Sequence, residues 1–279
     1  MTASLRMVAA EDEVPSFLGV ERSARGFRWT ERLDPSRAMV AIAIAQSHGL
    51  PELLGRVLAS RGADTNTITQ FLDPSLRNLL PDPHTLQDMS KAAGRFAEAI
   101  VSGEKIAVFG DYDVDGASSV ALIQRYLRAH GREASAYIPD RLTEGYGPSP
   151  SALTQLVGEG ATLILTVDCG TTGEAAIEAA NKAGAEVIVI DHHQADEALP
   201  PALAVINPNR QDDLSGQGHL AAAGVVFLFL IAVTRVLRRQ GFYANRPEPD
   251  LLGLLDLVAL ATVCDVVPLR GLNRALVAQ

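Results

Sequence analysis

Three short apolar segments constrain the fold of this chain more than any other feature of its sequence. They are residues 105–110 (KIAVFG), 162–167 (TLILTV) and 186–190 (EVIVI), and each is a nearly continuous apolar run. Such runs are typical of strands that are covered on both faces. Helical patterns follow the first two segments, at 117–130 and 172–183. Alternation of this kind predicts an α/β fold with a mostly parallel sheet flanked by helices.

The remainder of the chain is mostly helical in pattern. Residues 1–38 have mixed charge and no clear periodicity, so we expect a loosely packed arm there. We predict an N-terminal arm and helical extension over residues 1–80, and a separate α/β domain over residues 81–279. The patterns indicate further elements: a helix at 38–60, short helices and turns at 64–80, helices at 85–102, 219–240 and 250–264, and a strand at 134–138.

Composition narrows the cellular setting. The longest uncharged apolar run, 220–234, is too short to cross a bilayer comfortably, which favours a buried helix. We expect no secretory signal, because the N-terminus lacks an apolar core. Two cysteines form no disulfide framework, so we expect a protein of the reducing cytoplasm with no membrane partner.

The net charge of −9 counts against a nucleic-acid partner, since proteins that bind phosphates are usually basic. This objection weakens if many of the carboxylates bind metal ions, because each dication offsets the charge of two carboxylates. The charge therefore has to be weighed together with the position of the acidic residues.

Four clusters of metal-binding residue types stand out. Residues 111–116 (DYDVDG) follow the first apolar segment, Asp168 follows the second, and residues 191–193 (DHH) follow the third. The fourth is Asp265, at the end of an apolar helical segment. Ligands of open α/β sheets bind beyond the carboxyl ends of the strands. A single aspartate at such a place is usually a helix cap, but four clusters together indicate a metal site.

The ligand types favour Mn²⁺ or Mg²⁺. Carboxylates mixed with one or two imidazoles suit these ions better than structural zinc, which prefers Cys and His. A calcium loop of the EF-hand kind also begins D-x-D-x-D-G, but its twelfth position needs Glu and here is Leu122. A pair of divalent cations suits attack on phosphorus. Walker A and G-x-G-x-x-G loops are absent from the sequence.

The motifs DYDVDG, VDCG, DHH and CDVVPL, in this order, resemble the DHH phosphoesterase superfamily. Within it, the segments FLDPSL and PDRLTEGYG make the chain similar to the RecJ-type single-strand-specific DNA exonucleases. The resemblance runs from about residue 71 to residue 279 and implies a metal-dependent 5′→3′ exonuclease of DNA repair and recombination. It implies single-stranded DNA as a partner, together with a single-strand-binding protein and a helicase.

The resemblance also assigns roles to the clustered residues. Asp168 is expected to bridge the two divalent cations, Asp191 to orient a histidine, and His193 to contact the scissile phosphate or donate a proton. Asp111 belongs to the same acidic loop and is grouped with these catalytic residues. The expected metal ligands are Asp113, Asp115, Asp168, His192 and Asp265. Arg141 and Tyr146 are expected to guard a narrow entry that admits one strand of DNA.

Simpler interpretations stay open for several of these residues. His193 can be a buried histidine bound to a backbone carbonyl, and Arg141 a solvated arginine in a glycine-rich turn. Cys169 and Cys264 are more typical of small packing residues than of ligands. Residues 207–209 (NPN) form either a turn near the site or an ordinary turn, and the arginines of 235–239 suit a solvated helix end.

The chain also departs from the RecJ type, because we expect it to lack the C-terminal substrate-binding lobe and the oligonucleotide-binding barrel. Three functions therefore stay open. The first is the single-strand exonuclease. The second is a DHH enzyme for oligoribonucleotides, cyclic dinucleotides or pyrophosphate. The third is an inactive binding scaffold, against which the retention of every expected ligand type argues.

Overall fold

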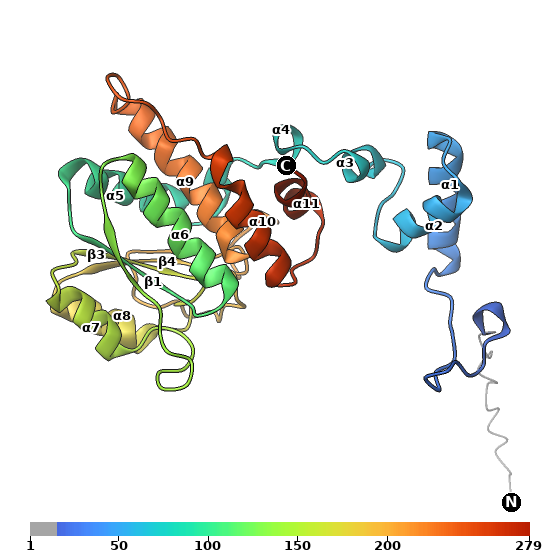
Figure 1. Cartoon of the computed structure of the whole chain (residues 1–279), viewed down its shortest axis with the longest axis horizontal. Coiled ribbons are helices and arrows are strands. Elements are labelled where there is room, and N and C mark those ends of the chain that lie inside the picture. Colours follow the sequence, from blue (N-terminus) through green and yellow to red (C-terminus); the bar gives the residue numbers. More distant parts are fainter. Residues whose placement is uncertain (1–15) are drawn as a thin grey trace, which may run out of the picture. The chain divides into compact units, whose positions relative to one another are not determined.

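The computed structural model describes residues 16–279, and contacts between Cα atoms divide the chain into two compact units at Asp73–Pro74. We describe the units separately (Figure 1). The first fifteen residues of the predicted arm lie outside the described part. The predicted domain boundary at residue 80 lies beyond this division, because α4 (Leu76–Leu79) packs against the last helix of the second unit.

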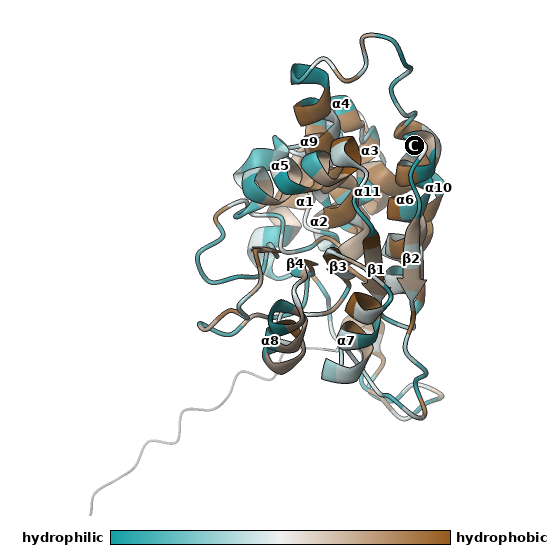
Figure 2. Cartoon of the chain, turned by 90° about the vertical axis from the view of Figure 1, so that its left-hand side faces the viewer, coloured by the Kyte–Doolittle hydropathy of each residue, from teal (hydrophilic) through white to brown (hydrophobic). Residues whose placement is uncertain are grey.

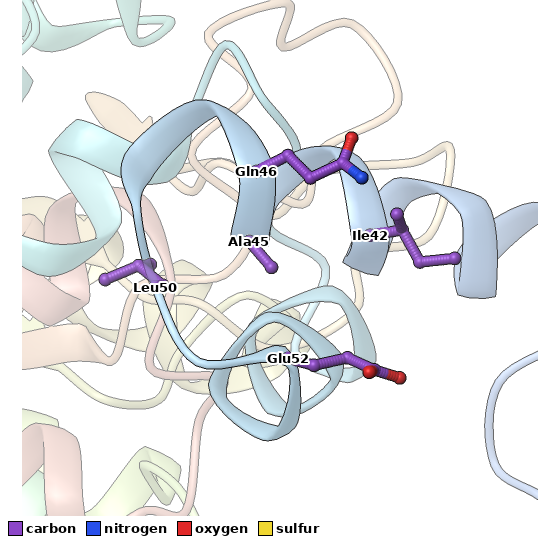
Figure 3. A pocket seen from close by; sticks show the side chains of 5 residues that line it. All are labelled: Ile42, Ala45, Gln46, Leu50 and Glu52. Atoms are coloured by element: carbon purple, nitrogen blue, oxygen red, sulfur yellow. The ribbon is translucent and has the colours of Figure 1, made fainter.

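The first unit is built on two packed helices, α1 (Pro35–His48) and α2 (Glu52–Ser60). The helical pattern predicted over 38–60 corresponds to two helices, because Gly49 takes a left-handed conformation (φ 61°) that ends α1, and Pro51 precedes α2. A short η1 turn (Phe17–Gly19) and helix α3 (Ile68–Leu72) complete the unit. A shallow hollow lies on α1 and the start of α2 (Figure 3), lined by Ile42, Ala45, Gln46, Leu50 and Glu52.

The second unit holds a five-stranded parallel sheet in the order β2-β1-β3-β4-β5. The sheet confirms the predicted α/β class. The unit's elements, in chain order, are α4, η2 (Pro83–Thr85), α5 (Met89–Ser102), β1 (Ile106–Gly110), α6 (Val114–Ala129), β2 (Ala134–Tyr137), α7 (Pro150–Gly158), β3 (Leu163–Val167), α8 (Glu174–Ala183), β4 (Glu186–Ile190), β5 (Ala204–Ile206), α9 (Ala222–Arg239), η3 (Leu252–Leu254), α10 (Leu255–Cys264) and α11 (Gly271–Ala278).

Helices cover both faces of the sheet, with α5, α6 and α9 on one side and α7 and α8 on the other (Figure 1). Alternate residues of β1 enter the two cores: Val108 joins the α5–α6–α9 side, and Phe109 joins the α7–α8 side. Strand β1 is therefore apolar throughout, as Figure 2 shows. The four strands that the sequence predicted correspond to β1–β4. Strand β5 and helices α7 and α11 were not predicted.

Helix α9 is the predicted buried helix, and most of its residues are inaccessible to solvent. Across residues 16–279, no helix combines the length and the apolar character needed to span a bilayer. The arginines at the end of α9 lie at a solvated helix end, as the sequence suggested, and two of them form ion pairs at the surface. Arg235 binds Asp82 at 2.7 Å, and Arg238 binds Glu248 at 2.6 Å.

A buried polar network joins α6 to α9 and to the loop that follows α9. His130 Nδ1 lies 2.7 Å from the Tyr126 carbonyl oxygen, and its Nε2 lies 2.8 Å from the Tyr243 hydroxyl. The Tyr126 hydroxyl contacts Thr234 Oγ1 at 2.9 Å. Burial, with a smaller contribution from Arg246, lowers the pKa of His130 below its ordinary value of 6.5. The neutral ring is thus the form that this packing favours.

Protonation of His130 should therefore destabilise the fold. Because its pKa is lower in the folded than in the unfolded chain, its contribution is complete above about pH 6.5 and is lost as the pH falls below that value. We expect the melting temperature of the wild type to drop more between about pH 7.5 and about pH 5.5 than that of His130→Gln. Equal drops in thermal melts of the two proteins would show that His130 does not contribute to the pH dependence.

Candidate metal centre

The carboxyl ends of four neighbouring strands place one polar residue each in a single row. Gly110, Val167, Ile190 and Ile206 end β1, β3, β4 and β5, and they are in register across the sheet. The next residues are Asp111, Asp168, Asp191 and Asn207. The backbone N–H groups of the three aspartates continue the ladder, with donor–acceptor distances of 3.3, 3.0 and 3.0 Å to the last carbonyl of the adjacent strand. Register therefore brings distant carboxylates together.

The acidic loop between β1 and α6 adds two carboxylates to this row. Asp113 is the N-cap of α6, and its Oδ1 accepts a hydrogen bond from the Gly116 N–H at 2.9 Å. Asp115 is buried in the first turn of α6, where its two oxygens accept from Ala222 N (2.6 Å) and Ala223 N (2.8 Å). Asp115 thus caps the start of α9, whose own N-cap residue is an alanine without a side-chain acceptor.

His192 lies where carboxylates from three elements converge. Its Nε2 is 3.3 Å from Asp168 Oδ1, 3.7 Å from Asp265 Oδ2 and 3.8 Å from Asp115 Oδ2. Ligand atoms within 4.8 Å of one another form three overlapping groups in the described chain: Asp111, Asp113 and Asp168; Asp115, His192 and Asp265; and Asp168, His192 and His193. The three groups thus contain seven of the eight residues that the sequence analysis named as ligands or catalytic groups, and the eighth, Asp191, contacts His193.

Several of these atoms are buried without a hydrogen-bond partner among residues 16–279. They are Asp111 Oδ1, both oxygens of Asp168, His192 Nε2 and Asp265 Oδ2. Buried polar atoms are almost always paired, because leaving one unpaired costs free energy. Their orphaned state, their grouping and their oxygen-rich chemistry fit divalent cations of the Mn²⁺ or Mg²⁺ kind.

The electrostatics of the cluster agree with this fit. Burial, reinforced by the charges of Asp115 and Asp113, raises the pKa of Asp168 to about 10. Burial also raises the pKa of Asp115 to about 6 and that of Asp111 and Asp265 above the usual carboxyl value. The pKa of all four carboxyl groups is thus raised in the absence of a metal ion. A dication reverses that shift and makes the ionised carboxylates favourable.

Asp191 holds the imidazole of His193. Its Oδ1 lies 2.8 Å from His193 Nδ1 and also accepts from the backbone N–H of His192 at 2.7 Å, while its Oδ2 accepts from Thr171 N at 3.0 Å. Burial alone would raise the pKa of Asp191, but the His193 and Thr171 hydrogen bonds hold it well below its usual range. The same hydrogen bond raises the pKa of His193. The simpler interpretation of His193, a ring bound to a backbone carbonyl, does not describe these contacts.

Two asparagines of the NPN segment fix the backbone of the DHH segment, which corresponds to the first of the two alternatives that the sequence left open, a turn near the site. Asn207 Nδ2 donates to the carbonyl oxygen of His193 and to Thr171 Oγ1, both at 2.9 Å. Asn209 Nδ2 donates to the carbonyl oxygen of His192 at 2.5 Å. The available signal was a polar NPN directly after the apolar AVI of β5, the same pattern that marked the other strand ends.

The expected entry residues differ in their contacts. Tyr146 reaches the centre, where its hydroxyl donates to the Asp168 carbonyl oxygen at 3.3 Å and lies 3.1 Å from His193 Nδ1. The Arg141 guanidinium lies over the Tyr112 ring, 5.1 Å from its centroid, beside the acidic loop. Tyr112 also lines an apolar hollow of about 480 Å³ next to Asp113, between α6 and α10.

The cysteines beside the proposed ligands take no part in the three groups. Cys169 is buried and Cys264 is exposed, and both are free thiols. Cys169 packs in the core on the α7–α8 side of the sheet, as expected of a small packing residue.

Comparison with known proteins agrees with this architecture. The profile described as "DHH family, N-terminal domain" matches residues 105–262, which is more than half of the chain. The chain belongs to the DHH family. Among DHH relatives, it is 43% identical over 233 residues to the single-stranded-DNA-specific exonuclease RecJ of Dickeya dadantii, covering 82% of this chain and 40% of that protein. It is 42% identical to RecJ of Escherichia coli over the same share.

A solved DHH-family structure is similar as well. RecJ of Thermus thermophilus in complex with Mn²⁺ superposes with a TM-score of 0.65 at 33% identity, over 88% of this chain and 32% of that one. The chain therefore spans well under half the length of the relatives that it matches.

Gly116 is the most sterically constrained position of the acidic loop. A Cβ atom there would lie 2.4 Å from the Asp111 carbonyl oxygen and 2.6 Å from its nitrogen, so the backbone of the loop has to move. We expect Gly116→Ala to lower the free energy of unfolding by about 1–3 kcal/mol or more. A Cβ on Gly94, in helix α5, meets nothing within 4 Å.

Gly94→Ala is therefore the matched control, and we expect it to stabilise the chain by about 0.5–1 kcal/mol. Urea denaturation of both variants measures the two effects. A Gly116→Ala protein as stable as the wild type would contradict the close packing of this loop.

Proposed function

We propose that this chain hydrolyses phosphodiester bonds of single-stranded DNA with two divalent cations, Mn²⁺ or Mg²⁺, releasing nucleotides from the 5′ end. The observation that carries the proposal is the convergence of partner-free ligand atoms from three strand ends and α10 on one place. The proposed ligands are Asp113, Asp115, Asp168, His192 and Asp265, with Asp111 close to the first group. Asp168 belongs to two of the groups, which supports a bridging position between the cations.

Bound cations of this kind supply a water of lowered pKa and neutralise charge that develops on a phosphate. The chain's own residues have separate tasks. Asp191 binds His193 through Nδ1, which leaves Nε2 as the ring atom available to a phosphate oxygen or a leaving group. The raised pKa of His193 favours a protonated ring, which suits donation of a hydrogen bond or a proton. Asn207 and Asn209 hold the backbone on which both histidines sit.

Arg141 and Tyr146 are proposed to receive the incoming strand. Tyr146 contacts both the Asp168 backbone and His193, so a base or sugar against its ring would lie beside the reacting phosphate. The Arg141 guanidinium can bind a phosphate with two parallel hydrogen bonds. Its stacking on Tyr112 orders a side chain that is otherwise exposed.

The names of the relatives support the choice of substrate and cation. The RecJ proteins of Dickeya dadantii and Escherichia coli are described as single-stranded-DNA-specific exonucleases, and RecJ structures contain Mn²⁺ or Mg²⁺. We propose a role in DNA repair and recombination and a cytoplasmic location, the latter on the two free thiols. A single-strand-binding protein and a helicase as partners are proposals that rest on the family resemblance alone.

Asp168→Asn should abolish metal-dependent hydrolysis without unfolding the chain. Asp168 has a left-handed backbone (φ 61°), which asparagine tolerates, and its carboxylate is unfavourably buried when no cation is present. We expect hydrolysis of labelled single-stranded DNA with Mn²⁺ to fall by about a thousandfold or more. We also expect Mn²⁺ to raise the melting temperature of the wild type but not of the variant.

Asp196→Asn is the control, because Asp196 is exposed and outside the ligand groups. Its activity should match that of the wild type. A dinucleotide and pyrophosphate belong in the same assay, and faster turnover of either would favour a different substrate. Full activity of Asp168→Asn would refute the site.

Arg141→Ala should weaken substrate binding more than it slows the chemical step. We expect KM for single-stranded DNA to rise about tenfold, as for the loss of one charge-assisted phosphate contact, with kcat within a factor of about three. The KM of Arg141→Lys should lie between that of the wild type and that of Arg141→Ala, since lysine keeps the charge but not the paired hydrogen bonds. Arg125→Ala, an exposed arginine of α6, serves as the control. An unchanged KM in Arg141→Ala would remove Arg141 from the entry.

A further inference from the structure

The first unit begins with a defined hairpin, residues 17–29, which we call the N-terminal hairpin. Its two arms pair through Phe17 N to Trp29 O (2.9 Å) and Trp29 N to Val20 O (3.0 Å). The tip closes through Ser23 N to Phe27 O (2.9 Å), and the Phe27 N–H also donates to Ser23 Oγ at 3.2 Å. These hydrogen bonds define the backbone that carries the side chains of the hairpin.

The hairpin exposes aromatic rings that a folded chain normally buries. Phe27 is 66% exposed, Trp29 47% and Phe17 36%. None of them belongs to the core of the first unit, which is formed by Leu33 and by residues of α1 and α2 and the segment after α2. Exposed apolar rings that gather on one short segment are typical of surfaces that bind a partner.

Arginines alternate with these rings. Arg22 and Arg25 are exposed at the tip, and Arg28 pairs with Glu21 at 3.0 Å. Residues 20–37 contain five arginines and three acidic residues, whereas the whole chain has 24 basic and 33 acidic residues. The segment is thus a basic region of an acidic protein, and a polyanion meets less repulsion there than elsewhere.

A hollow continues this surface toward α2. It has a volume of about 240 Å³, and Phe17, Arg32, Arg56 and Val57 are among the residues that line it. Glu31 also lines the hollow and forms an ion pair with Arg56, which offsets the charge of that arginine. The Phe17 ring beside the Arg32 guanidinium suits a base with its phosphate better than it suits an aliphatic helix.

We propose that the N-terminal hairpin and this hollow bind single-stranded DNA, with bases stacked on Phe27 and Trp29 and phosphates held by Arg22 and Arg25. Interleaved aromatics and arginines are the chemistry of single-strand binding, because rings stack on any base and guanidinium groups hold the backbone. This inference rests on the proposed function for its choice of polyanion. It gives an acidic protein a basic DNA-binding site in the first unit, whereas the metal centre belongs to the second.

Trp29 makes the proposal directly measurable, because it is the only tryptophan of the chain. Intrinsic fluorescence of the 279-residue protein is titrated with an oligothymidylate in EDTA, so that no hydrolysis occurs. We expect saturable quenching by single strands and little by blunt duplex. In parallel, fluorescence anisotropy of a labelled strand should show about 5- to 20-fold weaker binding by Trp29→Ala.

Charge reversal tests the arginines. Arg22→Glu/Arg25→Glu should weaken binding and lower the slope of log K against log salt by about 0.7 for each lost phosphate contact. Arg61→Glu/Arg128→Glu is the matched control, since both residues are exposed and lie outside the hairpin. Met39→Ala, an exposed apolar residue of α1, is the control for Trp29→Ala.

Three outcomes overturn the inference. One is the absence of binding up to about 100 µM, or binding in the anisotropy assay that leaves the Trp29 fluorescence unchanged. The second is equal loss in the control variants. The third is quenching by anionic lipid vesicles but not by DNA. Asp168→Asn should quench like the wild type, so a failure of the proposed hydrolysis is distinguishable from a failure of this site.

Discussion

The register of the parallel sheet is the constraint on which the rest of the structure depends. Because β1, β3, β4 and β5 end in one row, residues that are tens of positions apart in sequence become neighbours. A slip of one residue in any strand would turn Asp111, Asp168 or Asp191 toward the opposite face. The continuous apolar strands, buried between two layers of helices, make such a slip costly. The core therefore determines the geometry of the site.

The same arrangement buries several carboxyl groups close together and shifts their pKa values. Asp111, Asp115, Asp168 and Asp265 have pKa values raised mainly by burial, while Asp191 has its pKa lowered by the hydrogen bonds that it accepts. Asp111, Asp168 and Asp265 each keep a carboxylate oxygen without a hydrogen-bond partner, whereas Asp191 accepts several hydrogen bonds. This division matches a centre that binds cations on one side and positions a histidine on the other. The buried carboxylates without partners destabilise the fold locally, and the same feature favours the binding of dications.

Much of this could be predicted from the sequence, because each main strand is a local pattern and its acidic residue follows directly. β5 was not predicted because it has only three residues, and without it the sequence left open whether residues 207–209 lie near the site. The role of Asp115 as a helix cap was out of reach, since its partners are 107 and 108 residues away. Tyr146 was named for a resemblance, but its contacts with Asp168 and His193 depend on how the loop before α7 folds. Local patterns reveal strand ends, and tertiary packing decides which side chains meet there.

The double use of Asp115 affects how variants of this centre are to be interpreted. One carboxylate faces the ligand group and also closes the first turn of the long helix through the core. Replacing it removes a proposed ligand and a helix cap at once, so a loss of turnover in such a variant says little about the chemical step. Conversely, hydrogen exchange of the Ala222 and Ala223 amides, which donate to Asp115, reports on the state of the centre. A cation that binds the Asp115 carboxylate would change the hydrogen bonds of these two amides and therefore their protection from exchange.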